Sequence, residues 1–138
     1  MAKTFTAPFA QDPKNARAVV TTASADLHTT APTNTVLLCK AGADGGLLTR
    51  LSAVPRATVT DSDLLLWTSS DDGTTKYLLD SAKMAAHTVA ATTAIPLTSF
   101  SRYTEDTPLR LEANMSLYVG TAVTLASGIV FNGNYTDF

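Results

Sequence analysis

Few side chains in this sequence are of the types that perform catalysis, and they are dispersed. A hydrolytic site needs a nucleophile, a base and an orienting group within mutual reach. The chain has two histidines, His28 and His87, and no Gly-x-Ser-x-Gly segment. His87 follows Asp80 and Ser81, but closeness in sequence does not make a triad, and such a histidine is more often a packed or capping residue. We predict no catalytic residues and expect the protein not to be an enzyme.

The residues that bind metals are equally sparse. Cys39, the single cysteine, follows the apolar residues 36–38, where burial raises the pKa of a thiol and makes it unreactive. Three Cys and His residues so far apart are too few for zinc. Four aspartates flank one predicted hairpin and leave calcium as an alternative: Asp61, Asp63, Asp71 and Asp72. Aspartates in turns usually hydrogen-bond to their own backbone, so we predict no metal site and no cofactor.

Saccharide chemistry is a further alternative. Glycoside hydrolysis requires two placed carboxylates, and the only glutamates are Glu105 and Glu112, of which Glu112 is predicted to point outward from a strand. Five aromatic side chains could form the floor of a saccharide-binding site: Trp67, Tyr77, Tyr103, Tyr118 and Tyr135. Because such residues more often fill the space between two sheets, a carbohydrate-binding (receptor-binding) module is kept as an alternative function.

The composition favours strands. The chain has 138 residues, which fits one domain, and 16% of them are charged, below the roughly 25% that is typical. Threonine and alanine take the place of the missing charged residues. Threonine suits a half-exposed strand, whereas Glu and Lys, which are common on helical surfaces, are scarce in this chain.

The net charge of −2 and the dispersed arginines argue against a direct nucleic-acid partner. The longest apolar runs are much shorter than the ~20 residues that span a bilayer. The N-terminal residues also lack the apolar region of a secretory signal. We therefore expect no membrane partner.

Alternating apolar residues and turn signals predict about eight short strands in a single-domain β-sandwich or jelly roll. The predicted strands cover residues 16–22, 35–40, 47–59, 64–68, 76–80, 109–113, 116–123 and 129–135, and residues 94–99 are an edge strand or a loop. From Leu47 to Val59 the odd positions are mostly apolar, and Pro55 places this strand at an edge or a bulge. Glycines 42, 45 and 46 are expected to close a hairpin, and Asp80 to cap a short helix that ends near His87.

The N-terminal residues 1–15 are predicted to form an extended arm ahead of a sandwich domain that covers residues 16–138. Two prolines, Pro8 and Pro13, forbid a helix there and disfavour a central strand. Phe5 and Phe9 need an apolar surface, which is either the core of this domain or a neighbouring subunit. Phe5, Pro8, Phe9 and Pro13 are therefore the candidate contacts of the arm with another subunit.

Several stretches resemble a small family of virion proteins found in tailed phages that infect α-proteobacteria. The matching stretches are residues 31–38, 48–57, 85–96, 107–113 and 117–120. The resemblance implies a capsid decoration (cement) protein that binds the outer surface of the phage head, stabilises contacts between coat subunits and is assembled in the host cytoplasm. The implied partners are the major capsid protein and further copies of the chain in a homotrimer. A tail or head-fibre module is the alternative, and the family offers no catalytic residues.

Overall fold

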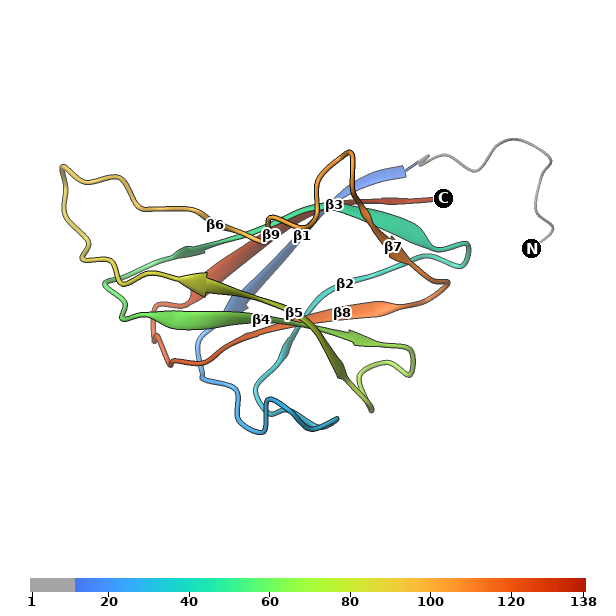
Figure 1. Cartoon of the computed structure of the whole chain (residues 1–138), viewed down its shortest axis with the longest axis horizontal. Helices are drawn as coiled ribbons and strands as arrows, with labels where there is room; N and C mark the ends of the chain where they lie inside the picture. Colours follow the sequence, from blue (N-terminus) through green and yellow to red (C-terminus); the bar gives the residue numbers. More distant parts are fainter. Residues whose placement is uncertain (1–11) are drawn as a thin grey trace.

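The computed structural model describes residues 12–138, which form two antiparallel sheets packed face to face (Figure 1). The predicted all-β fold is confirmed: residues 12–138 contain nine strands and no helix, and thus no helix able to cross a membrane. The strands are β1 (Asp12–Val20), β2 (Val36–Lys40), β3 (Gly46–Pro55), β4 (Ser62–Ser69), β5 (Tyr77–Met84), β6 (Thr98–Ser99), β7 (Leu109–Leu111), β8 (Ser116–Thr121) and β9 (Ile129–Asp137).

The strands pair in a nested order. The first strand pairs with the last, β2 pairs with β8, β3 pairs with both β6 and β7, and β4 pairs with β5. Two further pairings, β3 with β9 and β4 with β8, complete the sheets. Sheet A thus has the order β1-β9-β3-β6, with β7 also on β3, and sheet B has the order β2-β8-β4-β5. Apart from the consecutive pair β4 and β5, neighbouring strands are therefore far apart in sequence.

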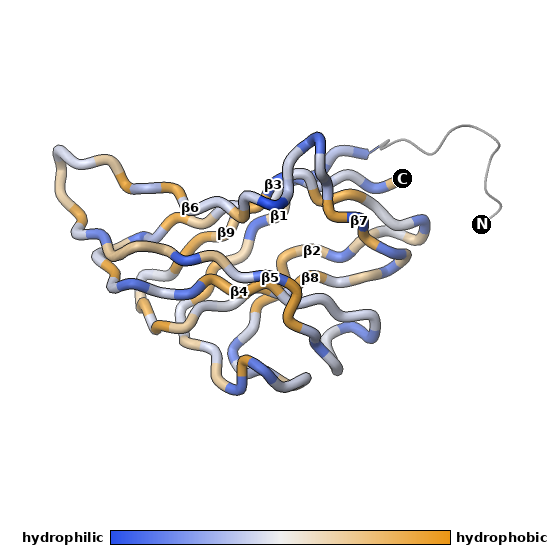
Figure 2. The backbone as a smooth tube through the Cα atoms, viewed as in Figure 1, coloured by the Kyte–Doolittle hydropathy of each residue, from blue (hydrophilic) through white to orange (hydrophobic). Residues whose placement is uncertain are grey.

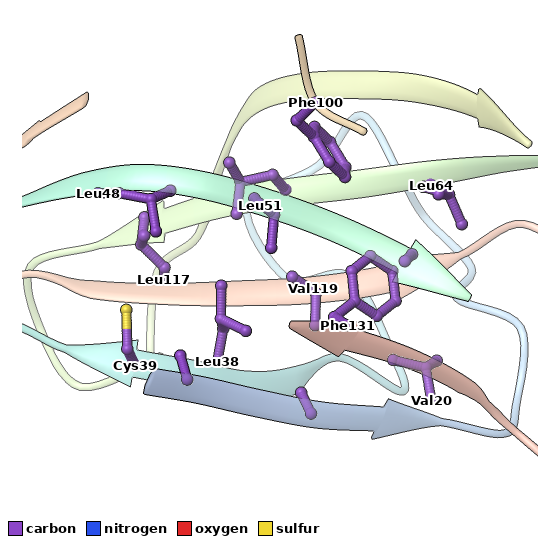
Figure 3. Close-up of a cluster of buried hydrophobic side chains, with 14 of the residues drawn as sticks. Val20, Leu38, Cys39, Leu48, Leu51, Leu64, Phe100, Leu117, Val119 and Phe131 are labelled. Atoms are coloured by element: carbon purple, nitrogen blue, oxygen red, sulfur yellow. The ribbon is translucent and has the colours of Figure 1, made fainter. Parts of the chain in front are cut away.

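Apolar side chains from both sheets fill the space between them (Figure 3). Leu51 and Phe131 of sheet A and Leu117 and Val119 of sheet B are almost completely buried there. Alternate residues of a strand point to opposite faces, so each sheet supplies every second side chain to this core. Figure 2 shows the resulting pattern, with apolar residues along the strands and hydrophilic residues in many of the turns.

The helix predicted between Asp80 and His87 is wrong. β5 continues as an extended strand to Met84, and Ser81 and Met84 pair with Leu65 and Ser62 of β4. The alanines and the capping sequence favour a helix only locally. Pairing with β4 places Met84 in the core at 1% exposure, and this burial outweighs the local preference.

The turn that contains glycines 42, 45 and 46 does not close a hairpin. It carries the chain from β2 in sheet B to β3 in sheet A, and each of these strands pairs with a strand from the C-terminal part of the chain. The positive φ expected of a glycine there is found at Gly45, where φ is 83°. Turn sequences indicate a reversal of direction, but they do not indicate which strands pair.

A β-bulge at Thr49 changes which side of β3 faces the core. The pairing with β9 shifts between Leu48 and Arg50, and as a result Leu48 and Leu51 both point inward. The predicted alternation is therefore wrong before the bulge, where Leu48 is buried. β3 is also not an edge strand, since it pairs on both sides, and Pro55 is its last residue.

The first strand begins at Asp12 rather than at Ala16. Pro13 therefore lies within the sandwich, paired with Thr136 of β9. β1 is the edge of sheet A, which is where a residue without an N–H group is tolerated. The other predicted arm contacts, Phe5, Pro8 and Phe9, lie outside the described residues.

Candidate functional site

Of the residues considered for catalysis, Asp80 makes structural contacts through its carboxylate, whereas the Nε2 atom of His87 is buried without a hydrogen-bond partner among the residues that the structure describes. The Asp80 carboxylate, almost completely buried, lies 3.2 Å from the Arg102 guanidinium and accepts a hydrogen bond of 2.8 Å from the Ser81 amide. His87 instead pairs through its backbone with Val59, 2.9 Å in each direction. Asp80 thus joins β5 to the segment after β6, and its contacts are those of an ion pair rather than of a proton relay.

Cys39 is buried, as predicted, and burial together with the Asp137 carboxylate raises the pKa of its thiol to about 12. A thiol with this pKa is protonated at neutral pH and is a poor nucleophile.

The aspartates considered for calcium also form hydrogen bonds and an ion pair with neighbouring residues. Asp71 accepts hydrogen bonds of 2.8 Å from both the Thr75 amide and the Ser69 hydroxyl, and these bonds lower its pKa. Asp72 forms an ion pair of 2.6 Å with Lys40, while Asp61, at the other end of β4, accepts a bond from the Ala86 amide. Within residues 12–138, no three Cys, His, Asp or Glu side chains gather closely enough to hold a metal ion.

The aromatic candidates separate into buried and exposed residues. Trp67 has no exposed surface and fills the outer side of sheet B, while Tyr118 and Tyr135 are half-buried. Tyr77, at the start of β5, is 61% exposed. Tyr103 is half-buried and lines a hollow together with Arg50 and Asn134.

A loop between β5 and β6, residues 85–97, extends beyond the end of the sandwich that lies away from the C-terminus (Figure 1). Its base is fixed to the turn between β3 and β4. The Ala86 amide donates to Asp61 (2.6 Å), His87 pairs with Val59, and the Val89 amide donates to the Thr58 hydroxyl (3.0 Å). Loops of about this length without a helix or strand are uncommon, and they are usually either functional or linker segments.

This β5–β6 loop exposes apolar side chains and carries no Asp, Glu, Lys or Arg. Val89, Ile95 and Leu97 are each more than two-fifths exposed. A second exposed apolar group, Tyr77, Leu78 and Leu79, lies at the start of β5, the edge strand of sheet B. Exposed apolar side chains on a fixed loop are typical of surfaces that contact another protein.

The outer side of sheet A carries a different set of side chains. The strand register places Asn15, Asn134 and Arg50 in one row across β1, β9 and β3. The next row contains Arg17 and Asn132, which are joined by a hydrogen bond of 3.3 Å. We call these five residues the polar face.

A hollow of about 440 Å³ adjoins the polar face. Arg50 and Asn134 of the polar face line it on one side, and Tyr103, Thr104 and Glu105 line it on the other. Of the two glutamates, Glu105 thus lies at this concave surface, whereas Glu112 is exposed in the turn after β7. A second hollow, of about 320 Å³, lies between β5 and β6 around the Asp80–Arg102 ion pair.

No family model, curated protein or solved structure matches the chain.

The polar face could not be found from single residues in the sequence. Its members come from three strands that the register alone brings together, and β1 and β9 are at opposite ends of the chain. One signal was present: in Ile129–Asp137 the polar residues Asn132, Asn134 and Thr136 alternate with residues that face the core. An alternating strand with amides on its outer side indicates a polar, uncovered sheet face.

Proposed function

We propose that the protein is a capsid decoration (cement) protein, which binds the outer surface of a tailed-phage head and acts without catalysis. The resemblance to phage virion proteins suggests the role. The observation that carries the proposal is the β5–β6 loop, which combines a fixed base with exposed apolar side chains and no formal charge. A loop of this kind suits a dry contact with a preformed protein surface.

The strand order supports the proposal. The chain is paired as one long hairpin, first strand with last and second with second to last, folded so that its strands alternate between two sheets. We infer from this order a jelly roll, an architecture that viral capsid domains and lectins share. The fold by itself does not define the function, but this fold is suited to a stiff particle component.

The fixed base of the loop reduces the entropy that binding costs. Because Ala86 and Val89 are already bonded to the β3–β4 turn, less conformational freedom is lost when the loop meets a coat subunit. A homotrimer would present three such loops. Three linked contacts of about 4 kcal/mol each, individually millimolar, reach the nanomolar range before ordering costs.

Sedimentation of phage heads that lack the protein tests the proposal. We expect the wild-type chain to sediment with the heads in a fixed, saturable number of copies. Leu97→Asp should weaken this binding at least tenfold, because it places a charge in a dry contact. Leu37→Asp on β2 is the matched control, since Leu37 and Leu97 are both 48% exposed, and it should bind like the wild type.

Three outcomes would count against the proposal. Wild-type protein that stays in the supernatant contradicts a decoration role, and binding to tails instead of heads supports the tail-fibre alternative. Full binding by Leu97→Asp removes the β5–β6 loop from the contact. For the homotrimer, light scattering should give three times the 14.5 kDa of one chain, either free or when released from heads, and a single-chain mass in both states contradicts it.

A further inference from the structure

We propose that the polar face of sheet A and the adjoining hollow bind an acidic saccharide, meaning a sugar chain that carries carboxylate groups. This inference goes beyond capsid binding, because it concerns a different surface from the β5–β6 loop. It rests on the five side chains of the polar face and on the residues that line the hollow.

The register makes the polar face a regular array. Asn15 lies opposite Asn134, and Asn134 lies opposite Arg50; in the next row Arg17 lies opposite Asn132. Directly paired residues have Cβ atoms about 5 Å apart, and neighbouring strands are separated by about 4.8 Å. This spacing is close to the repeat of a sugar ring, so successive hydroxyl groups can meet successive side chains.

The chemistry of the array matches a ligand with many oxygens and a negative charge. Each asparagine amide offers two donors and an acceptor, which pair with sugar hydroxyls. Each guanidinium can hold a carboxylate through two parallel hydrogen bonds. Within residues 12–138, neither Arg17 nor Arg50 lies within ion-pair distance of a carboxylate, so both retain free charge.

The nearby acidic residues do not cancel this charge. Asp12 and Asp137, at one end of the same strands, both lie next to Lys14, at 3.3 and 2.7 Å. The outward positions of β1, β9 and β3, all of which the structure describes, carry no acidic residue. Glu105 lies across the hollow from Arg50, where its carboxylate can accept a bond from a sugar hydroxyl.

The hollow adds a concave end to the flat array. Its volume of about 440 Å³ lies within the ~300–1,000 Å³ of ligand pockets. Tyr103 lines the hollow, and burial together with the Asp80 carboxylate raises its pKa to about 12, which keeps the phenol neutral. An aromatic ring beside amides and hydroxyls is a suitable surface for one face of a sugar.

Two other polyanions fit the face less well. Nucleic-acid binding relies on neutralising several phosphates with a basic patch, and the polar face has only two guanidiniums among three amides. An acidic peptide supplies carboxylates but few hydroxyl groups, and poly-glutamate is therefore one arm of the test.

Titration calorimetry with carboxylated oligosaccharides tests the proposal. The probes are oligogalacturonate, alginate and hyaluronan oligomers, and the control ligand is methyl-esterified oligogalacturonate, which keeps the hydroxyls and loses the charge. We expect at least one acidic probe to bind at least tenfold more tightly than an uncharged oligosaccharide. Arg50→Ala and Asn134→Ala should each weaken that binding at least fivefold, and Arg56→Ala, an exposed arginine of the β3–β4 turn, should not.

The proposal is overturned if none of the three acidic probes binds more tightly than dextran. It is also overturned if poly-glutamate or a single-stranded oligonucleotide binds as tightly, since the face would then recognise charge alone. Failure here leaves capsid binding intact, because Arg50→Ala should sediment with phage heads like the wild type while Leu97→Asp should not.

Discussion

The outer sides of the two sheets differ in what covers them. On sheet B, Leu65 and Trp67 are buried outside the main core, and the covering segment between β1 and β2, residues 21–35, places Ser24 beside the Trp67 ring near Gly120. The Ser24 amide donates to the Thr121 carbonyl (2.8 Å), and the Lys76 amide donates to the Thr30 carbonyl (2.9 Å). Within residues 12–138, no such cover lies over the row of Asn15, Asn134 and Arg50 on sheet A, and all three residues are exposed.

The comparison shows how one sandwich obtains two kinds of outer surface. On sheet B the outward residues Leu65 and Trp67 are buried in a second small core, whereas the outward Val19 of sheet A stays 40% exposed. Where the outward residues are amides and arginines, the sheet needs no cover and stays available to a ligand. Stability should therefore depend on the outer side of sheet B, and binding on that of sheet A.

Replacing Trp67 by alanine should have the largest effect. Its side chain is completely buried between sheet B and the covering segment. Loss of a buried aromatic side chain costs about 3–5 kcal/mol, and we expect the free energy of unfolding in urea to fall by this amount. A loss below about 1 kcal/mol would mean that the segment does not pack on the tryptophan.

A pair of glycines should separate the outer side of sheet B, at Gly120, from the main core, at Gly133, by a smaller effect. A Cβ atom at Gly120 of β8 would lie 2.7 and 3.0 Å from Trp67 ring atoms, whereas at Gly133 of β9 it would lie 3.2 Å from the Arg50 carbonyl oxygen. Gly120→Ala should destabilise the protein by about 1–3 kcal/mol through overpacking. Gly133→Ala should change stability by less than about 1 kcal/mol, and thermal unfolding of both variants measures the difference; equal losses would contradict it.

The turn that connects β4 and β5 should give sheet B a dependence on pH. Hydrogen bonds from Thr75 and Ser69 lower the pKa of Asp71 below its ordinary value of 3.8. The folded state therefore gains stability from the ionised carboxylate above pH ~4, and this gain is lost as pH falls through the lower, folded pKa. Asp71→Asn should reduce the melting temperature at pH 7, with a smaller reduction at pH 2; an equal reduction at both would contradict the ionised role.

The smallest effect on stability is expected on the polar face. Arg50→Ala and Asn134→Ala remove exposed side chains that do not fill the core, so each should change the free energy of unfolding by less than about 0.5 kcal/mol. Chemical denaturation measures this change. A loss above about 1.5 kcal/mol from either substitution would show that the polar face serves stability and would remove the contrast between the sheets.

The sequence predicts the class of fold better than it predicts which strands pair with one another. The apolar run at Leu64–Trp67 and the apolar residues after the turn at Gly128 are sufficient to predict β4 and β9, because these signals lie within or next to each strand. The inter-sheet turn at Gly45, the bulge at Thr49 and the strand through Ser81 depend on partners distant in sequence. The polar face belongs to this second group, since Asn15 and Asn134 meet only through the pairing of β1 with β9.

Electron cryomicroscopy of purified virions tests the proposed role of the protein most directly. The account predicts sandwich-shaped density at symmetry-related positions on the head, with residues 85–97 against the coat subunits and the polar face of sheet A exposed to solvent. Heads without such density, or sandwiches attached with residues 85–97 directed into solvent, would contradict it.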